Sequence, residues 1–333
     1  MEKKEDENVP LVSVCVITYN HEEYIRQCLD SILMQNVNFP YEILIHDDAS
    51  PDGTADIIRE YEAKYPGVIK PIYQTENQYS QGKSVEKFNL ERARGKYLAF
   101  CEGDDYWTDP GKLQKQVDYL EEHLEYIAYV HRVRTIDEFG NVRDRRTYDT
   151  LEYTISDAEN IFTDCGCAGP TCSLVCRNIF LTLPKDIHEK FLNCNSNGDS
   201  KLFLLLTLNG TICRFNDVMS VYRRITSKGY SWTARHANKN NCLFSFNCIN
   251  ELAQFSQKSY GFTPNYTDRK NELALISIYK FITKINKNNW NIMCKLLNAT
   301  NNKSALIIHI IKFRKRIFNE LLKSRKKDSI INV

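Results

Sequence analysis

The 333-residue sequence lacks the features that would place it in a membrane or outside the cell. No apolar run approaches the ~20 residues that a membrane-spanning helix needs. The first ten residues, MEKKEDENVP, are too acidic and too polar for a secretory signal peptide. We therefore expect a cytoplasmic protein whose 12 cysteines are thiols rather than disulfides.

The sequence also lacks an excess of charge of one sign. Its net charge is +2, which gives no electrostatic footprint for a nucleic-acid partner. The exception is segment 304–327, where isoleucines and a phenylalanine alternate with lysines and arginines. This segment predicts either an amphipathic helix on anionic lipid or a helix that packs on the protein with a solvated basic face. The first alternative would place the protein peripherally on the inner face of the plasma membrane.

Common ligand-binding motifs are missing as well. No Gly-x-Gly-x-x-Gly follows the first strand, which argues against a dinucleotide site, and His21 lacks the second histidine of a zinc-protease helix. Four cysteines lie closer together than the separated pairs of a structural zinc site. They fit packed thiols better than zinc, and they are Cys165, Cys167, Cys172 and Cys176.

Strand and helix patterns alternate through the first 125 residues. Apolar, β-branched runs such as LVSVCVIT (11–18) indicate strands that are buried on both faces. This alternation predicts an α/β fold with a parallel sheet. Further strands are expected at 41–45, 68–73, 96–101 and 211–223, and helices at 21–35, 52–65, 110–123, 198–208 and beyond 238. A charged loop or exposed hairpin is expected at 132–148.

Acidic residues stand where two of these strands end. The pairs Asp47-Asp48 and Asp104-Asp105 would meet at one edge of the sheet, where α/β proteins bind ligands. Carboxylates gathered there would hold Mg²⁺ or Mn²⁺, or would accept hydrogen bonds from a base or ribose. One such pair alone would more often cap the next helix, but two pairs favour a site. Asp199, at the start of an apolar helix, would by itself be read as a helix cap.

Three segments carry a family resemblance: VSVCVITYNHEEYIRQCLDSILMQ, YEILIHDDASPDGTADII and GKYLAFCEGDDYWTDPGKLQKQ. Together they resemble the family 2 glycosyltransferases, which are inverting enzymes with the mainly parallel GT-A sheet flanked by helices. The resemblance implies a catalytic domain at 11–235, with a nucleotide-binding half at 11–125 and an acceptor half at 126–235. A charged tail at 1–10 and a helical extension at 236–333 would flank it.

The resemblance also implies a role for each motif residue. The donor would be a nucleotide-diphospho-sugar, expected to be UDP-linked, and the cofactor would be Mn²⁺ or Mg²⁺. The acceptor would be a saccharide or lipid-linked glycan hydroxyl in bacterial surface polysaccharide synthesis. The donor-binding residues would be Thr18, Tyr19, Asn20, Asp48, Arg94 and Asp104, the metal ligands Asp104 and Asp105, and the general base Asp199.

One position departs from the family pattern, and two other functions compete with this assignment. Relatives often carry Tyr-Arg-x-His after the last strand, whereas Ile225 stands at the histidine position here, so Arg223 or Arg224 is the alternative contact for the diphosphate. A sugar nucleotidyltransferase is a rival, but the chain lacks the expected glycine-rich, basic loop after the first strand. An inactive, carbohydrate- or partner-binding fold is the other rival, although such a protein would not need all these carboxylates.

Overall fold

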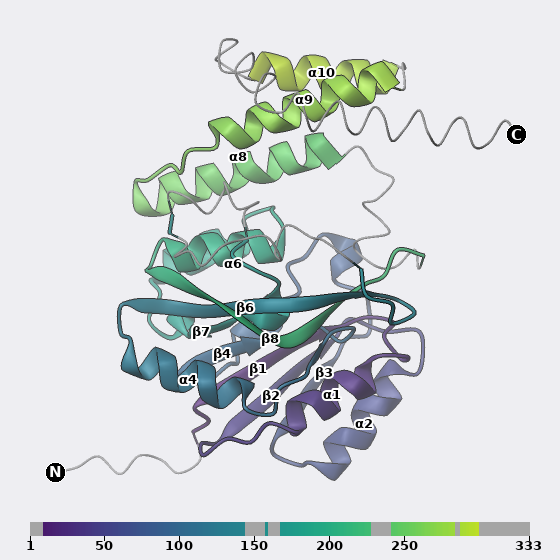
Figure 1. The fold of residues 1–333 in the computed structure, drawn as a ribbon, viewed down its shortest axis with the longest axis vertical. Helices are drawn as coiled ribbons and strands as arrows, with labels where there is room; N and C mark the ends of the chain where they lie inside the picture. Colours follow the sequence, from purple (N-terminus) through teal and green to yellow (C-terminus); the bar gives the residue numbers. More distant parts are fainter. Residues whose placement is uncertain (1–8, 144–156, 159–166, 228–240, 284–286, 300–333) are drawn as a thin grey trace, which may run out of the picture.

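The computed structural model describes residues 9–143, 157–158, 167–227, 241–283 and 287–299. It is a layered α/β structure whose eight-stranded sheet has the order β3-β2-β1-β4-β7-β6-β8-β5. Figure 1 shows helices on both sides of this sheet and a stack of helices beyond one side. The predicted α/β class is therefore confirmed.

The first half of the sheet is parallel, as predicted. It contains β1 (Val12–Thr18), β2 (Tyr41–Asp47), β3 (Ile69–Tyr73) and β4 (Tyr97–Phe100), and β1 lies between β2 and β4. Thr18 of β1 pairs in register with Asp47 of β2, so both strands end at the same edge of the sheet. The loops that carry the predicted site residues start from this edge.

The second half of the sheet is mixed. Strand β7 (Val175–Arg177) runs antiparallel to both β4 and β6 (Tyr126–Asp137), while β8 (Thr211–Arg224) is parallel to β6 and antiparallel to β5 (Tyr106–Trp107). Of the two alternatives for 132–148, the loop was wrong up to Asp137, whereas the described part of the segment does form a hairpin, with Ile136 antiparallel to Val142. Strand β6 continues to Asp137, because it pairs along its length with β8, about eighty residues later in the chain. A turn at Gly140, with φ of 84°, ends it.

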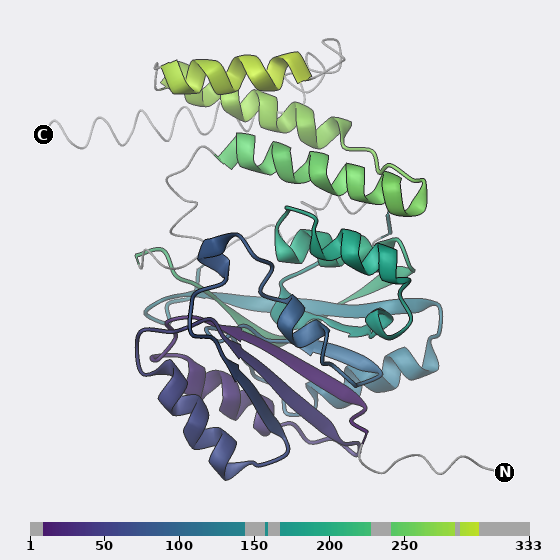
Figure 2. The same cartoon turned by 180° about the vertical axis from the view of Figure 1, so that it is seen from behind.

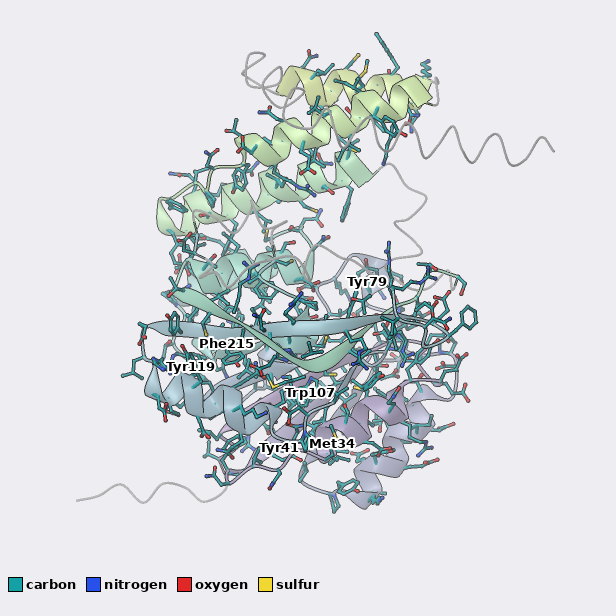
Figure 3. All side chains as sticks on the ribbon, viewed as in Figure 1. Met34, Tyr41, Tyr79, Trp107, Tyr119 and Phe215 are labelled. Carbon is teal, nitrogen blue, oxygen red and sulfur yellow. The ribbon has the colours of Figure 1, made fainter. Side chains whose placement is uncertain are left out.

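One face of the sheet packs against α1 (Ile25–Leu33), α2 (Thr54–Lys64) and α4 (Lys112–Glu122). Alternate strand side chains such as Val12, Val14 and Val16 point to this side and are fully buried. Helix α4 also reaches the second half of the sheet, where the rings of Tyr119 and Phe215, labelled in Figure 3, lie 4.8 Å apart. Strand β5 and helix α1 lie next to each other on this side.

The opposite face packs against α3 (Lys87–Leu90), α5 (Lys185–Leu192) and α6 (Gly198–Thr207). Every residue of α6 from Lys201 to Thr207 is buried, because the helices α8 (Asn241–Tyr260), α9 (Thr267–Thr283) and α10 (Lys287–Ala299) lie beyond it. Figure 2 shows α6 between the sheet and α8. The helical C-terminal part is therefore confirmed.

None of the helices that the structure describes is long and apolar enough to cross a membrane. The basic segment 304–327, with its predicted amphipathic helix, lies outside the described residues. Its contact with lipid stays a prediction.

Candidate active site

The loop after β1 is shaped by hydrogen bonds to the loop after β2. Asn20 has a positive φ of 60°, and its backbone N–H donates to Ser50 Oγ at 2.9 Å. Ser50 Oγ in turn donates to the buried carboxylate of Asp47. Thr18 is buried, whereas Tyr19 and Asn20 are half-buried and remain partly open to solvent at this edge. The three residues predicted to line the base site therefore lie together beside the end of β2.

Asp48 holds the next loop in place. Its Oδ1 accepts a hydrogen bond from the backbone N–H of Gln78 at 2.7 Å, and its Oδ2 accepts one from the N–H of Tyr79 at 3.0 Å. Burial raises the pKa of Asp48, and these two N–H donors act against that rise. Each carboxylate oxygen can accept a second bond, so Asp48 could receive a donor from a base as well. Tyr79, labelled in Figure 3, is 43% exposed on this loop.

Arg94 does not join this group. It precedes β4, and its guanidinium and backbone N–H both donate to Glu42, which pairs with Ser13 near the start of β1 and β2. Arg94 thus lies at the amino end of the strands, opposite the edge where Thr18 and Asp48 lie. The prediction that Arg94 approaches the base or diphosphate is corrected: in a parallel sheet, a residue that comes before a strand lies at the other end.

The segment 102–105 follows β4 and passes close to the loop after β1. The backbone N–H of Gly103 donates to Ile17 O at 3.0 Å, and a Cβ at Gly103 would lie only 2.5 Å from Thr18 Oγ1. Asp104 is 20% exposed, and its Oδ2 lies 3.8 Å from His21 Nε2. His21 was not predicted as a site residue. Its position directly after the Thr18–Asn20 loop was the available signal.

Asp105 faces the interior instead. It is 2% exposed, and its Oδ1 accepts a hydrogen bond from the backbone N–H of Arg223 at 2.7 Å. Its Oδ2 is buried without a hydrogen-bond partner among the described residues. Burial, followed by the nearby Asp104 charge, raises its pKa well above the usual range. The Asp105 carboxyl group thus connects the segment after β4 to β8 and is closed to solvent. Asp104 is partly exposed and is therefore the better placed of the two to bind a metal ion.

Arg223 binds the segment 104–105 from β8. Its Nε donates to the carbonyl of Asp104 at 2.9 Å and its Nη2 to Gln27 Oε1 at 2.9 Å, and its guanidinium lies 4.5 Å from the Tyr24 ring. The side chain is therefore engaged with protein groups, and Arg224, the other alternative for the diphosphate, is exposed at the end of β8. Ile225, at the position of the missing histidine, is buried.

The charge of Asp199, from the first turn of α6, acts on Glu102, at the end of β4. Asp199 is exposed, yet the surrounding protein and the Glu86 charge raise its pKa to about 6. Burial, followed by the Asp199 charge, raises the pKa of Glu102 to about 7, and Asp104 adds to this rise. Thr171 donates a short hydrogen bond to Glu102 Oε1, while Glu102 Oε2 is buried without such a partner in the described part of the chain. Carboxylates from β4 and α6 therefore converge.

These carboxylates are too few to hold a divalent cation by themselves, but they could hold one together with the phosphates of a bound donor. Within the described ranges, no group of three or more His, Cys, Asp or Glu side chains is placed to hold an ion. Mg²⁺ usually takes one or two carboxylates and completes its shell with water and substrate phosphates. Asp104, half-open beside the unpartnered Glu102 Oε2, fits that role. An ion here would be shared with a diphosphate.

The cysteine set does not converge. Cys172 and Cys176 are both fully buried, but they pack into the cores on opposite faces of the sheet. One ion cannot reach both thiols. Cys165 lies outside the described residues.

Comparison with known proteins identifies the family of this chain. The profile of glycosyl transferase family 2 matches residues 13–183, which is just over half of the sequence. The chain therefore belongs to this family. The match contains Thr18–Asn20, Asp48 and Asp104, but it ends before Asp199.

Individual relatives match shorter parts. An uncharacterized Mycobacterium tuberculosis protein, Rv1520, is 50% identical over 131 residues, which are 39% of this chain and 37% of that protein. TuaG of Bacillus subtilis, named as a candidate teichuronic acid biosynthesis glycosyltransferase, is 35% identical over 46% of this chain and 62% of its own length. The chain thus matches between about a third and two thirds of the length of these relatives.

A solved structure shares the fold over a longer stretch. The crystal structure of Staphylococcus aureus TarS 1-349 in complex with UDP-GlcNAc matches with a TM-score of 0.60. The match covers 87% of this chain and 80% of that one, at 18% sequence identity. It establishes that the chain has the GT-A fold.

Proposed function

We propose that this chain is an inverting glycosyltransferase that moves a sugar from a nucleotide-diphospho-sugar, UDP-linked, to a hydroxyl of a saccharide or lipid-linked glycan. The observation that supports this proposal is that the charges of Asp199, from α6, and of Asp104, from the end of β4, both act on Glu102. Membership of family 2 supports the reaction class. The name of TuaG supports a role in surface polysaccharide synthesis.

In this proposal the edge formed by β1 and β2 binds the nucleotide. Tyr19 and Asn20 flank the base, and the Asp48 carboxylate accepts a hydrogen bond from it. Because Asp48 also holds the N–H groups of Gln78 and Tyr79, the loop that carries Tyr79 would be set in place for the donor. Asp104 would hold Mn²⁺ or Mg²⁺, which neutralises charge on the departing diphosphate.

Asp199 supplies the base. An acceptor hydroxyl is a weak nucleophile and must lose its proton as it attacks the anomeric carbon. The Asp199 carboxylate, with its pKa raised to about 6, is charged at neutral pH and more basic than an ordinary aspartate. Attack from its side, with the diphosphate leaving from the side of Asp104, inverts the anomeric centre.

The test is thermal stabilisation by a panel of nucleotide sugars, each with and without Mn²⁺. A ligand that binds only the folded state stabilises it by about 2.7 kcal/mol at a hundredfold excess over its dissociation constant. A shift with one UDP-sugar that requires Mn²⁺, followed by release of UDP when glycans are added, supports the proposal. No shift with any nucleotide sugar would favour an inactive binding protein. Release of pyrophosphate from UTP and a sugar phosphate would point to a nucleotidyltransferase.

The peripheral membrane contact is a separate part of the proposal. Segment 304–327 would bring the enzyme to a lipid-linked acceptor. Flotation with vesicles of phosphatidylglycerol and phosphatidylcholine tests it, with phosphatidylcholine vesicles as the control. Binding that is lost on deletion of 304–333 supports the contact, and equal binding by the deleted protein rules it out.

A further inference from the structure

Helix α6 carries a buried lysine two residues after Asp199. Lys201 is 2% exposed, and its Nζ lies 2.7 Å from Glu86 Oε1 and donates to Ser84 Oγ at 2.7 Å. The Nζ also lies 5.0 Å from the centre of the Phe191 ring of α5. A buried ammonium group is costly unless it is paired, so this ion pair ties α6 to the segment that precedes α3.

The partner of this lysine lies directly against the start of α6. A Cβ built on Gly198 would be only 3.2 Å from Glu86 Oε1. Burial acts to raise the pKa of Glu86, but the Lys201 ammonium, together with hydrogen bonds from Ser84 and the backbone, lowers that pKa below its usual value, so Glu86 is charged at neutral pH. The carboxylate of Glu86 therefore carries its charge beside the backbone that leads into Asp199.

Lys201 and Asp199 point to different sides of α6. Residues two apart on a helix do not share a face. This agrees with the burial of Lys201 and the exposure of Asp199. The ion pair thus fixes the inner side of the helix while the carboxylate of Asp199 stays on its open side.

We propose that Glu86 and Lys201 are positioning residues for Asp199: Lys201 anchors the helix that carries the base, and Glu86 supplies the negative charge beside it. This inference rests on the proposed function, in which Asp199 takes the proton from the acceptor. The charged groups around Asp199 are Glu86 from the segment before α3, Glu102 from the end of β4, and Lys201 on α6 itself. Neither Glu86 nor Lys201 needs to touch substrate.

The electrostatic consequence has a definite sign. A negative charge next to a carboxyl group disfavours its ionisation and makes it a stronger base. The Glu86 charge is, after the surrounding protein, the main cause that raises the pKa of Asp199 to about 6. Glu86→Gln keeps the shape of the side chain and removes the charge, so the pKa of Asp199 should fall.

The direct experiment is a ¹³C NMR titration of the full chain with labelled aspartate side-chain carboxyl groups. The Asp199 signal is assigned by its loss in Asp199→Asn. We expect Glu86→Gln to lower the pKa of Asp199 by roughly half a unit or more. Glu60→Gln is the matched control, because Glu60 of α2 forms an exposed ion pair with Arg26 of α1, on the other face of the sheet. It should leave the Asp199 titration unchanged.

A second variant protects the test against misfolding, since Glu86→Gln leaves Lys201 as an unpaired buried charge. The double variant Glu86→Gln with Lys201→Met removes both charges and should still show a fall in the Asp199 pKa, smaller than in Glu86→Gln because the Lys201 charge no longer adds to it. An unchanged Asp199 titration in these variants would overturn the inference. The proposed function fails separately: if Asp199→Asn released UDP from the UDP-sugar as fast as the wild type, the base assignment would be wrong whatever the titration showed.

Discussion

At the scale of single residues, Asp199 is a carboxyl group whose surroundings disfavour its charged form. The protein around it, followed by the Glu86 charge, raises its pKa to about 6. Perturbed carboxyl groups of this kind concentrate at functional sites. An aspartate that only capped α6 would gain from a low pKa, because the helix N-terminus favours the charged form.

The first prediction concerns pH and the loss of this carboxylate. Sugar transfer should fall as the pH drops through about 6, because Asp199 then takes up a proton and cannot act as a base. Asp199→Asn should lower the turnover number by roughly 10²–10⁴-fold while the dissociation constant of UDP stays the same. Asp186→Asn, which removes an exposed carboxylate on α5, is the control. Full turnover by Asp199→Asn would exclude the base role.

A second prediction concerns Gly103. A Cβ at this position would lie 2.5 Å from Thr18 Oγ1 and 2.8 Å from His21 Nδ1, so Gly103→Ala must push apart the ends of β1 and β4. We expect UDP to bind at least about tenfold more weakly, with a loss of about 1–3 kcal/mol in the free energy of unfolding.

Gly111→Ala is the matched control for that experiment. Its Cβ would come no closer than 3.3 Å to Asp109 Oδ1, so the contact is much milder. Isothermal titration with UDP compares the two variants. Equal affinity for UDP in both would show that the close approach of Gly103 to Thr18 does not shape the nucleotide site.

At the scale of helices and strands, the first four parallel strands were predictable from sequence, since β1, β2 and β4 are short apolar runs buried on both faces and β3 is a short run between turn residues. The acidic strand ends followed from the same pattern, and Asp48 and Asp104 do lie at one edge. Strand β6 beyond residue 131 was not predictable, because its charged residues are placed in the sheet by β8, which is distant in the sequence. The sequence around Arg132 and Arg134 does not by itself indicate that β8 pairs with it.

The same dependence on distant strands explains why Asp105 and Arg94 do not have the positions predicted for them. Asp104 and Asp105 are adjacent in sequence and equally acidic, but only Asp105 meets the backbone of Arg223, because β5 pairs with β8 at this point. Arg94 looked close to the site because it comes three residues before the start of β4. Strand direction places it at the other end, against Glu42.

The start of α4 gives a third prediction. Lys112 is fully buried, its Nζ lies 4.1 Å from the centre of the Trp107 ring, and it has no hydrogen-bond partner among the described residues. Burial lowers its pKa from 10.5 to about 7. The unfolded state therefore binds more protons between these values, so stability should rise with pH from about 7 towards 10.

Lys112→Met should remove this dependence, since methionine buries a similar volume without a polar group. We expect the variant to be more stable at pH 7 by about 1–3 kcal/mol, which is the usual cost of an unsatisfied buried group. Urea unfolding at pH 7 and pH 9 measures both effects. Lys115→Met, on the exposed side of the same helix, is the control. A less stable Lys112→Met protein would mean that the amine has a favourable partner.

At the scale of the whole molecule, the C-terminal helices share a core with the sheet. One continuous apolar cluster contains Leu44 of β2, Phe203 of α6, Leu252 of α8, Leu273 of α9 and Leu296 of α10. Helix α6 is buried from both sides as a result, and Asp199 lies in its first turn. The helical part after residue 236 therefore supports the proposed base through α6, although the sequence suggested a separate extension.

The last prediction tests this dependence by truncation. A chain of residues 1–227 loses α8, α9 and α10 and exposes the outer side of α6, where each uncovered large apolar side chain costs about 1.5–3 kcal/mol. Several such losses exceed the 5–15 kcal/mol that stabilises a typical domain. The 1–227 chain should therefore aggregate or fail to fold. A chain of residues 1–299 keeps the three helices and should melt in one transition close to that of the full chain. Circular dichroism and gel filtration distinguish these outcomes, and a folded 1–227 chain with an unchanged melting temperature would show that the sheet and α6 are stable without the C-terminal helices.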